Sequence, residues 1–86
     1  VATINNQRSR YFLQAGSFKD FQAAESRRAM LALIGIESEI QKANIPKRGL
    51  WHRVRIGPFL SLPDMRRTRK RLKNNDIKSI MLTVKK

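Results

Sequence analysis

Three residues at alternate positions of one short stretch could recognise a ligand together: Trp51, Arg53 and Arg55. An indole ring offers a flat apolar surface on which a sugar or a nucleic-acid base can pack. An arginine guanidinium donates a fork of hydrogen bonds to a carboxylate or a phosphate. Because side chains alternate along a strand, all three would point to one face if this stretch is extended. The pattern therefore indicates a site for a ligand with flat rings and negative charge.

A second stretch, residues 11–16, is rich in strand formers and ends at a glycine. Its alternation places Phe12 and Gln14 on one face, and residues 50–57 divide in the same way. In both stretches the other face should meet the core: Tyr11, Leu13 and Ala15 in one, and His52, Val54 and Ile56 in the other. We expect Phe12 and Gln14 to join the three residues above on a face that no helix covers.

Two helices can be predicted from their capping residues. Asp20 can accept hydrogen bonds from the free N–H groups at the start of a helix over residues 21–34, which Gly35 would end. Ser61 can cap a second helix with Pro63 in its first turn. The second helix is strongly basic around a narrow apolar stripe. We interpret its basic surface as a solvated face that aids solubility and general attraction to anions.

Two further strands are expected at about residues 36–43 and 77–84, with a loop over residues 44–49. Residues 1–9 are polar without a strict period, which predicts a disordered lead-in before a single domain at residues 10–86.

The chain uses one pattern twice, because residues 14–18 and 55–59 each combine a strand end, a glycine and a phenylalanine two residues later. Each is followed by a helix and then a strand. Two βαβ halves in series predict an α+β fold, the ferredoxin-like or RNP-like βαββαβ domain. Its four-stranded antiparallel sheet would place the fourth strand beside the first, followed by the third and the second. Both helices would cover one face.

Charge and composition limit the class of protein. The chain has 19 Lys and Arg against 6 Asp and Glu, a net charge of +13, which attracts nucleic acids, anionic lipids or acidic glycans. It has no cysteine, and His52 is the single histidine, so neither a cofactor nor a metal site is predicted. No apolar run is long enough to span a membrane. The chain begins with Val1, and we expect it to be a segment of a longer protein.

Three motifs together resemble the SPOR domain: YFLQAGSF at residues 11–18, AExxRAxL at residues 24–31 and WHRVRIGPF at residues 51–59. The resemblance spans the ordered chain from about residue 10 to residue 84. It implies non-catalytic binding of peptidoglycan, specifically of glycan strands stripped of their stem peptides. It also implies a periplasmic location, in a parent protein anchored in the inner membrane that targets the septum or cell wall and meets cell-division proteins.

The resemblance further implies which residues lie in the glycan groove. Gln14, Ser17, Trp51 and Arg53 are implied, in agreement with the alternation described above. Ile80 is implied as well, although its alternation with Leu82 and Val84 predicts that it faces the core. With the residues from the strand pattern, the predicted glycan-binding set is Phe12, Gln14, Ser17, Trp51, Arg53, Arg55 and Ile80.

A physical reason supports a basic aromatic surface for this ligand. Removal of the stem peptide by an amidase frees the lactyl carboxylate of each muramic acid, so that the stripped strand is a polyanion with repeating sugar faces. Arg53 and Arg55 could bind the carboxylates, while Trp51 or Phe12 packs on a sugar ring. A simpler alternative is that the two arginines form ion pairs with Glu37 and Glu39 on the neighbouring strand.

Nucleic-acid binding is the main alternative function. RRM domains use a similar βαββαβ sheet and stack bases on its open face, and the charge of this chain suits that use. However, residues 51–56 lack the paired aromatic residues of the RRM signature. A protein-interaction module that docks through the sheet or the basic helix is a third possibility. No catalytic triad or phosphate-binding glycine loop is found, and the cap positions of Asp20 and Asp64 account for those carboxylates.

Overall fold

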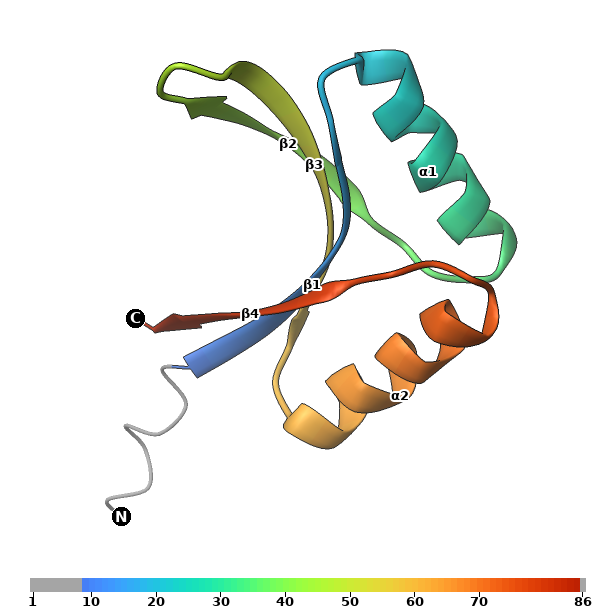
Figure 1. The fold of residues 1–86 in the computed structure, drawn as a ribbon. Coiled ribbons are helices and arrows are strands. Elements are labelled where there is room, and N and C mark those ends of the chain that lie inside the picture. Colours follow the sequence, from blue (N-terminus) through green and yellow to red (C-terminus); the bar gives the residue numbers. More distant parts are fainter. Residues whose placement is uncertain (1–8, 86) are drawn as a thin grey trace.

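A computed structural model describes residues 9–85 of the chain as one sheet with two helices packed on one of its faces (Figure 1). The sheet is antiparallel with the strand order β2-β3-β1-β4, so the predicted fold and topology are confirmed. The predicted lead-in lies outside the described residues except for Ser9, which begins β1. In chain order the elements are β1 (Ser9–Phe18), α1 (Phe21–Leu33), β2 (Glu39–Ile45), β3 (Gly49–Phe59), α2 (Leu62–Asn74) and β4 (Ile80–Lys85).

Both helices begin at the predicted caps. The Asp20 carboxylate accepts a hydrogen bond from the backbone N–H of Gln22 at 3.2 Å, and the Ser61 hydroxyl accepts one from the N–H of Asp64 at 3.2 Å. These bonds satisfy donors that have no partner within the first turn of a helix. Helix α1 ends at Leu33, one residue earlier than predicted.

The two helices end in the same way, which extends the internal repeat. The N–H of Ile36 bonds the carbonyl of Leu31 at 2.9 Å, and the N–H of Ile77 bonds that of Leu72 at 2.9 Å. Each bond spans the left-handed residue that follows the helix, which is Gly35 in the first half and Asp76 in the second. Both isoleucines are thereby carried into the core, where they are buried.

This helix ending explains why β2 and β4 begin later than predicted. Ile36 and Ile77 are apolar, but they pack under the sheet as part of the helix ends. Pairing begins only at Glu39 in β2 and at Ile80 in β4. The predicted loop at residues 44–49 is also shorter, because β2 and β3 pair as far as Ile45 and Gly49.

The core lies between the sheet and the two helices, and the predicted inner face is confirmed. Leu13, Ala15, His52, Val54 and Ile56 are all buried, and Tyr11 packs against them. The remaining buried hydrophobic residues come from the helices and their ends: Ala24, Leu31, Ile36, Met65, Leu72 and Ile77.

The opposite face of the sheet is not covered by either helix. Figure 1 shows the sheet from its edge, with the middle of β1 and β3 bowed toward the helices. The open face is therefore the inside of a curve. Two irregularities in the pairing of β1 with β3 interrupt the regular register, and such bulges increase the local bend and twist of a sheet.

Candidate functional site

A row of side chains crosses the open face from one edge of the sheet to the other. Glu39 is paired with Arg55, Arg55 with Gln14, and Gln14 with Ile80. Residues that are directly opposite in an antiparallel pair project to the same side of the sheet. The row therefore places Arg55, Gln14 and Ile80 side by side, although they come from distant parts of the sequence.

The prediction that Ile80 faces the core was wrong. Ile80 is 60% exposed, and its pairing with Gln14 places it on the open face. Met81 and Thr83 occupy the helix side of β4 instead. The apolar alternation was misleading because the core residue of this segment is Ile77, which lies before the strand and is buried. The structure thus places Ile80 with the other residues of the predicted set without any bulge in β4.

Ser17 reaches the open face only because β1 is irregular. Strict alternation from Gln14 would turn Ser17 toward the helices, so the expected agreement between alternation and the position of Ser17 was wrong. The register shifts between these two residues, and Ser17 pairs with Arg53 while Phe18 packs against the core. Gly16 lies at the shift with φ of +154°, and a Cβ there would approach the Phe18 ring to 2.6 Å. A glycine is therefore needed at the point of β1 where the alternation of side chains between the two faces of the sheet is shifted.

The two arginines on the open face have no acidic partner within the described residues. Ion pairs there join Arg28 to Glu25 and Arg67 to Asp64, and none involves Arg53 or Arg55. The alternative that Glu37 and Glu39 neutralise the two arginines is therefore not what the structure shows. The Nε atoms of Arg53 and Arg55 are buried and lack a hydrogen-bond partner in the described part of the chain. A buried donor without a partner costs about 1–3 kcal/mol.

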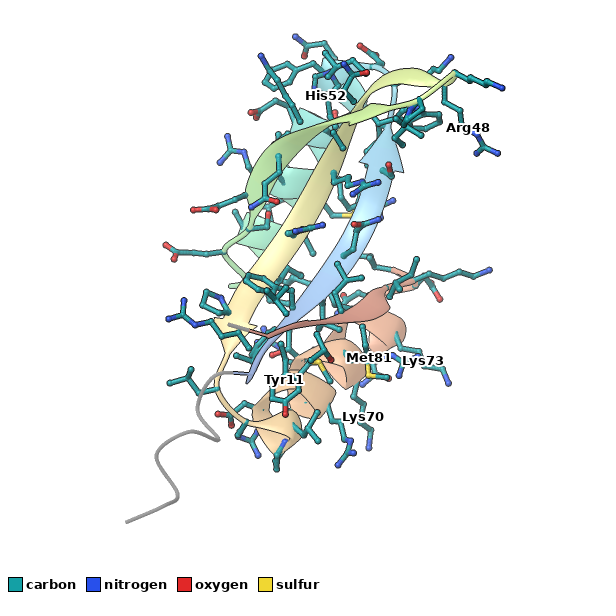
Figure 2. The ribbon with its side chains drawn as sticks, turned by 90° about the vertical axis from the view of Figure 1, so that its left-hand side faces the viewer. Tyr11, Arg48, His52, Lys70, Lys73 and Met81 are labelled. Carbon is teal, nitrogen blue, oxygen red and sulfur yellow. The ribbon has the colours of Figure 1, made fainter. Side chains whose placement is uncertain are left out.

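Trp51 lies toward the β2–β3 turn, near one end of the open face. Its indole N–H donates to the carbonyl of Arg48 at 3.3 Å, which helps to fix the ring. The Lys19 Nζ lies 5.7 Å from the centre of the ring, a distance suited to a cation–π contact. Figure 2 looks onto the open face and shows Arg48 at this turn. The sequence pattern missed Lys19, and its position directly after the β1 end was the signal available.

Phe12 lies toward the other end of the face. It is paired with Leu82 and lies beside Gly57, where a Cβ would approach the Phe12 ring to 3.0 Å and the Tyr11 carbonyl to 2.9 Å. From Trp51 to Gly57 along β3 the distance is roughly 20 Å, at about 3.3 Å per residue. The face thus carries an aromatic ring toward each end and unpaired arginines between them.

A shallow depression of about 490 Å³ adjoins this face where β1 extends beyond its pairing with β4. Gln14, Ser17 and Ile80 line it, together with Lys78 and Ser79 from the segment before β4. Lys78 is a basic residue that the sequence reasoning did not single out; it was included in the expected strand at residues 77–84, whereas β4 begins only at Ile80. The predicted residues Gln14, Ser17 and Ile80 are therefore brought together by one feature of the surface.

Residues 9–85 show neither a metal site nor a membrane-spanning helix. No group of three or more His, Cys, Asp or Glu side chains that could hold a metal ion is found there. His52 is buried, with its ring edge-on to that of Phe21 at 5.4 Å between centroids. Among the described helices, none is long and apolar enough to cross a membrane.

These features define a class of protein: a βαββαβ module with an open, basic and aromatic sheet face. The family model for the SPOR domain matches residues 7–83, and the chain belongs to the SPOR domain family. The family resemblance seen in the sequence is thereby confirmed.

Two solved structures are similar to the chain. The crystal structure of the RlpA SPOR domain from Pseudomonas aeruginosa is 26% identical with a TM-score of 0.75, and the match covers 84% of this chain and 96% of that one. The solution structure of the peptidoglycan-binding domain of the B. subtilis cell wall lytic enzyme CwlC is 28% identical with a TM-score of 0.70. That match covers 88% of this chain and 90% of the CwlC domain. No curated protein matches the chain significantly.

Proposed function

We propose that the chain binds peptidoglycan through the open face of its sheet and prefers glycan strands stripped of stem peptides. Two facts support the ligand class: the family of the chain, and its similarity to a CwlC domain that is described as peptidoglycan-binding. The observation that carries the preference for stripped strands is the pair Arg53 and Arg55 on the open face, which form no ion pair with any described residue. Their free donors match a ligand that carries carboxylates.

The binding mechanism follows from the arrangement of the face. A stripped strand lies along the curve of the sheet with its lactyl carboxylates at Arg53 and Arg55. The amide of Gln14 and the hydroxyl of Ser17 bond to sugar hydroxyl groups, since both side chains can donate and accept. Trp51 and Phe12 pack on sugar ring faces, and Ile80 adds apolar contact. Intact strands bind less well because their carboxylates are amidated and their peptides are bulky.

The proposed role is retention and not catalysis. The chain would hold its parent protein on the cell wall, in the periplasm and near the septum, where stripped strands arise during cell division. Anchoring of that parent in the inner membrane and contact with cell-division proteins belong to the same proposal. The family match favours glycan over nucleic acid as the ligand.

The test is a titration with a soluble stripped oligosaccharide. We expect Arg53→Gln to weaken binding about tenfold, which is the loss of roughly one charge-assisted hydrogen bond. Arg28→Gln removes the same charge from an exposed position on α1 where the arginine pairs with Glu25, and it should change affinity less than twofold. If both variants bind like the parent, or both lose affinity equally, the sheet face is not the site.

A further inference from the structure

Helix α2 carries basic side chains that its own residues do not neutralise. Arg67 pairs with Asp64, and Arg71 donates to the carbonyl of Ile34. Arg66, Lys70 and Lys73 are exposed and make no hydrogen bond or ion pair to any residue in the range 9–85. Like charges three or four residues apart repel each other on a helix. A solvated face normally mixes both signs, so this row is better suited to binding a polyanion than to solubility alone.

The surface beside this row is hollowed in two adjoining places. A depression of about 560 Å³ is lined by Arg66, Lys70 and Asn74, and one of about 620 Å³ by Ile77 and Lys78. Arg69 and Lys73 line both. The two depressions therefore adjoin each other along α2 at Arg69 and Lys73.

The same hollow leads to the open face of the sheet. Lys78 and Ser79 line the depression on the α2 side, and they also line the one that holds Gln14, Ser17 and Ile80. Figure 2 shows Lys70 and Lys73 on α2 beside Met81 of β4, projecting past the sheet as seen from its open face. A track with basic residues along its length thus runs from the sheet, past Lys78, to α2. Asp76 is the acidic residue among those that line it.

We infer that this track is an extension of the glycan site, so that a long stripped strand leaves the sheet at Ile80, passes Lys78 and binds along α2. The inference rests on the proposed function. A strand is a polymer, and the sheet face of roughly 20 Å holds only part of it. Its carboxylates continue beyond the sheet, and the row from Arg66 to Lys73 offers about 10 Å more of positive charge. Because the basic track is continuous with the sheet face, one glycan strand that occupies both is favoured over a separate polyanion bound to α2.

The test compares a stripped tetrasaccharide with long amidase-treated strands at low salt. The double variant Lys70→Gln/Lys73→Gln should bind the tetrasaccharide as tightly as the unsubstituted chain does. It should bind the long strands about five- to tenfold more weakly, because only they reach α2. Neither side chain bonds to another described residue, so folding should be preserved. The double variant Lys70→Arg/Lys73→Arg should restore the preference for long strands.

The control is Arg28→Gln/Lys42→Gln, which removes the same charge from exposed positions on α1 and β2. If it lowers long-strand affinity as much as the α2 variant, net charge is the cause and the track is refuted. An α2 variant that loses RNA binding but keeps long-strand binding would also refute it and assign α2 to another polyanion. If the unsubstituted chain binds neither glycan, both the proposed function and its extension along α2 are refuted. If the unsubstituted chain binds both glycans and the α2 variant behaves like the control variant, only the extension along α2 is refuted.

Discussion

At the scale of single residues, the site is distinguished by which arginines have partners. Arg28 is paired with Glu25, whose hydrogen bond and negative charge raise the pKa of its guanidinium. Arg27 donates to the carbonyl of Ala15 at 2.6 Å and lies over the Phe18 ring. These arginines serve the fold itself. Arg53 and Arg55, in contrast, lie on the open face and form no ion pair with a described residue, which leaves their charge available to the anionic ligand that we propose.

Gly16 should be essential to the structure of the open face, because it lies at the shift in β1 that brings Ser17 onto this face. A Cβ at Gly16 would meet the Phe18 ring, whereas one at Gly49 would meet nothing within 4 Å, although both glycines have positive φ. We expect Gly16→Ala to lower the free energy of unfolding by about 1–3 kcal/mol more than Gly49→Ala does. Chemical denaturation measures this difference. Equal losses from the two substitutions would show that the contact with Phe18 does not matter.

Strand alternation predicted most of the face but could not predict where the alternation shifts. The facing of Phe12, Gln14, Trp51, Arg53 and Arg55 follows from a period of two, and the register confirms it. Ser17 depends on a bulge, which is a property of two strands together and leaves no periodic signal in either one.

At the scale of elements, the two halves of the chain repeat their helix ends as well as their strands. Leu31 and Ile36 in the first half correspond to Leu72 and Ile77 in the second, joined by the same backbone bond. The caps could be predicted from residue type alone, because Asp20 and Ser61 need only their own helix. The starts of β2 and β4 could not, because an isoleucine that follows a helix end looks the same in sequence as one that begins a strand. The facing of Ile80 was misjudged for this reason.

The cap of α2 offers a test of this local account. Replacing Ser61 with alanine removes the hydroxyl that accepts the N–H of Asp64, and we expect the free energy of unfolding to fall by about 1 kcal/mol. Ser26→Ala is the matched control, because Ser26 is exposed within α1 and alanine favours a helix there. Urea denaturation of both variants gives the values. A loss for Ser61→Ala no larger than for Ser26→Ala would contradict the role of the cap.

At the scale of the whole molecule, the net charge of +13 acts on every anion, and this makes specificity the central question. Such a charge accelerates encounter with any polyanion and gives salt-sensitive binding without selecting a ligand. In the function that we propose, selectivity comes from the shape and spacing of the sheet face, where aromatic rings lie to either side of Arg53 and Arg55. The composition predicted an anionic partner, but only the fold brings Gln14, Arg55 and Ile80 into one row.

The most direct measurement is retention of the protein on two preparations of sacculi, one treated with an amidase and one intact, with RNA present as a competitor. Our account predicts strong retention on the treated sacculi that RNA does not displace, weak retention on the intact ones, and loss of the difference in Trp51→Ala and Arg53→Ala variants. Equal retention on both preparations that RNA or moderate salt abolishes would contradict it. The net charge alone would then explain binding, and nucleic acid would become the better candidate ligand.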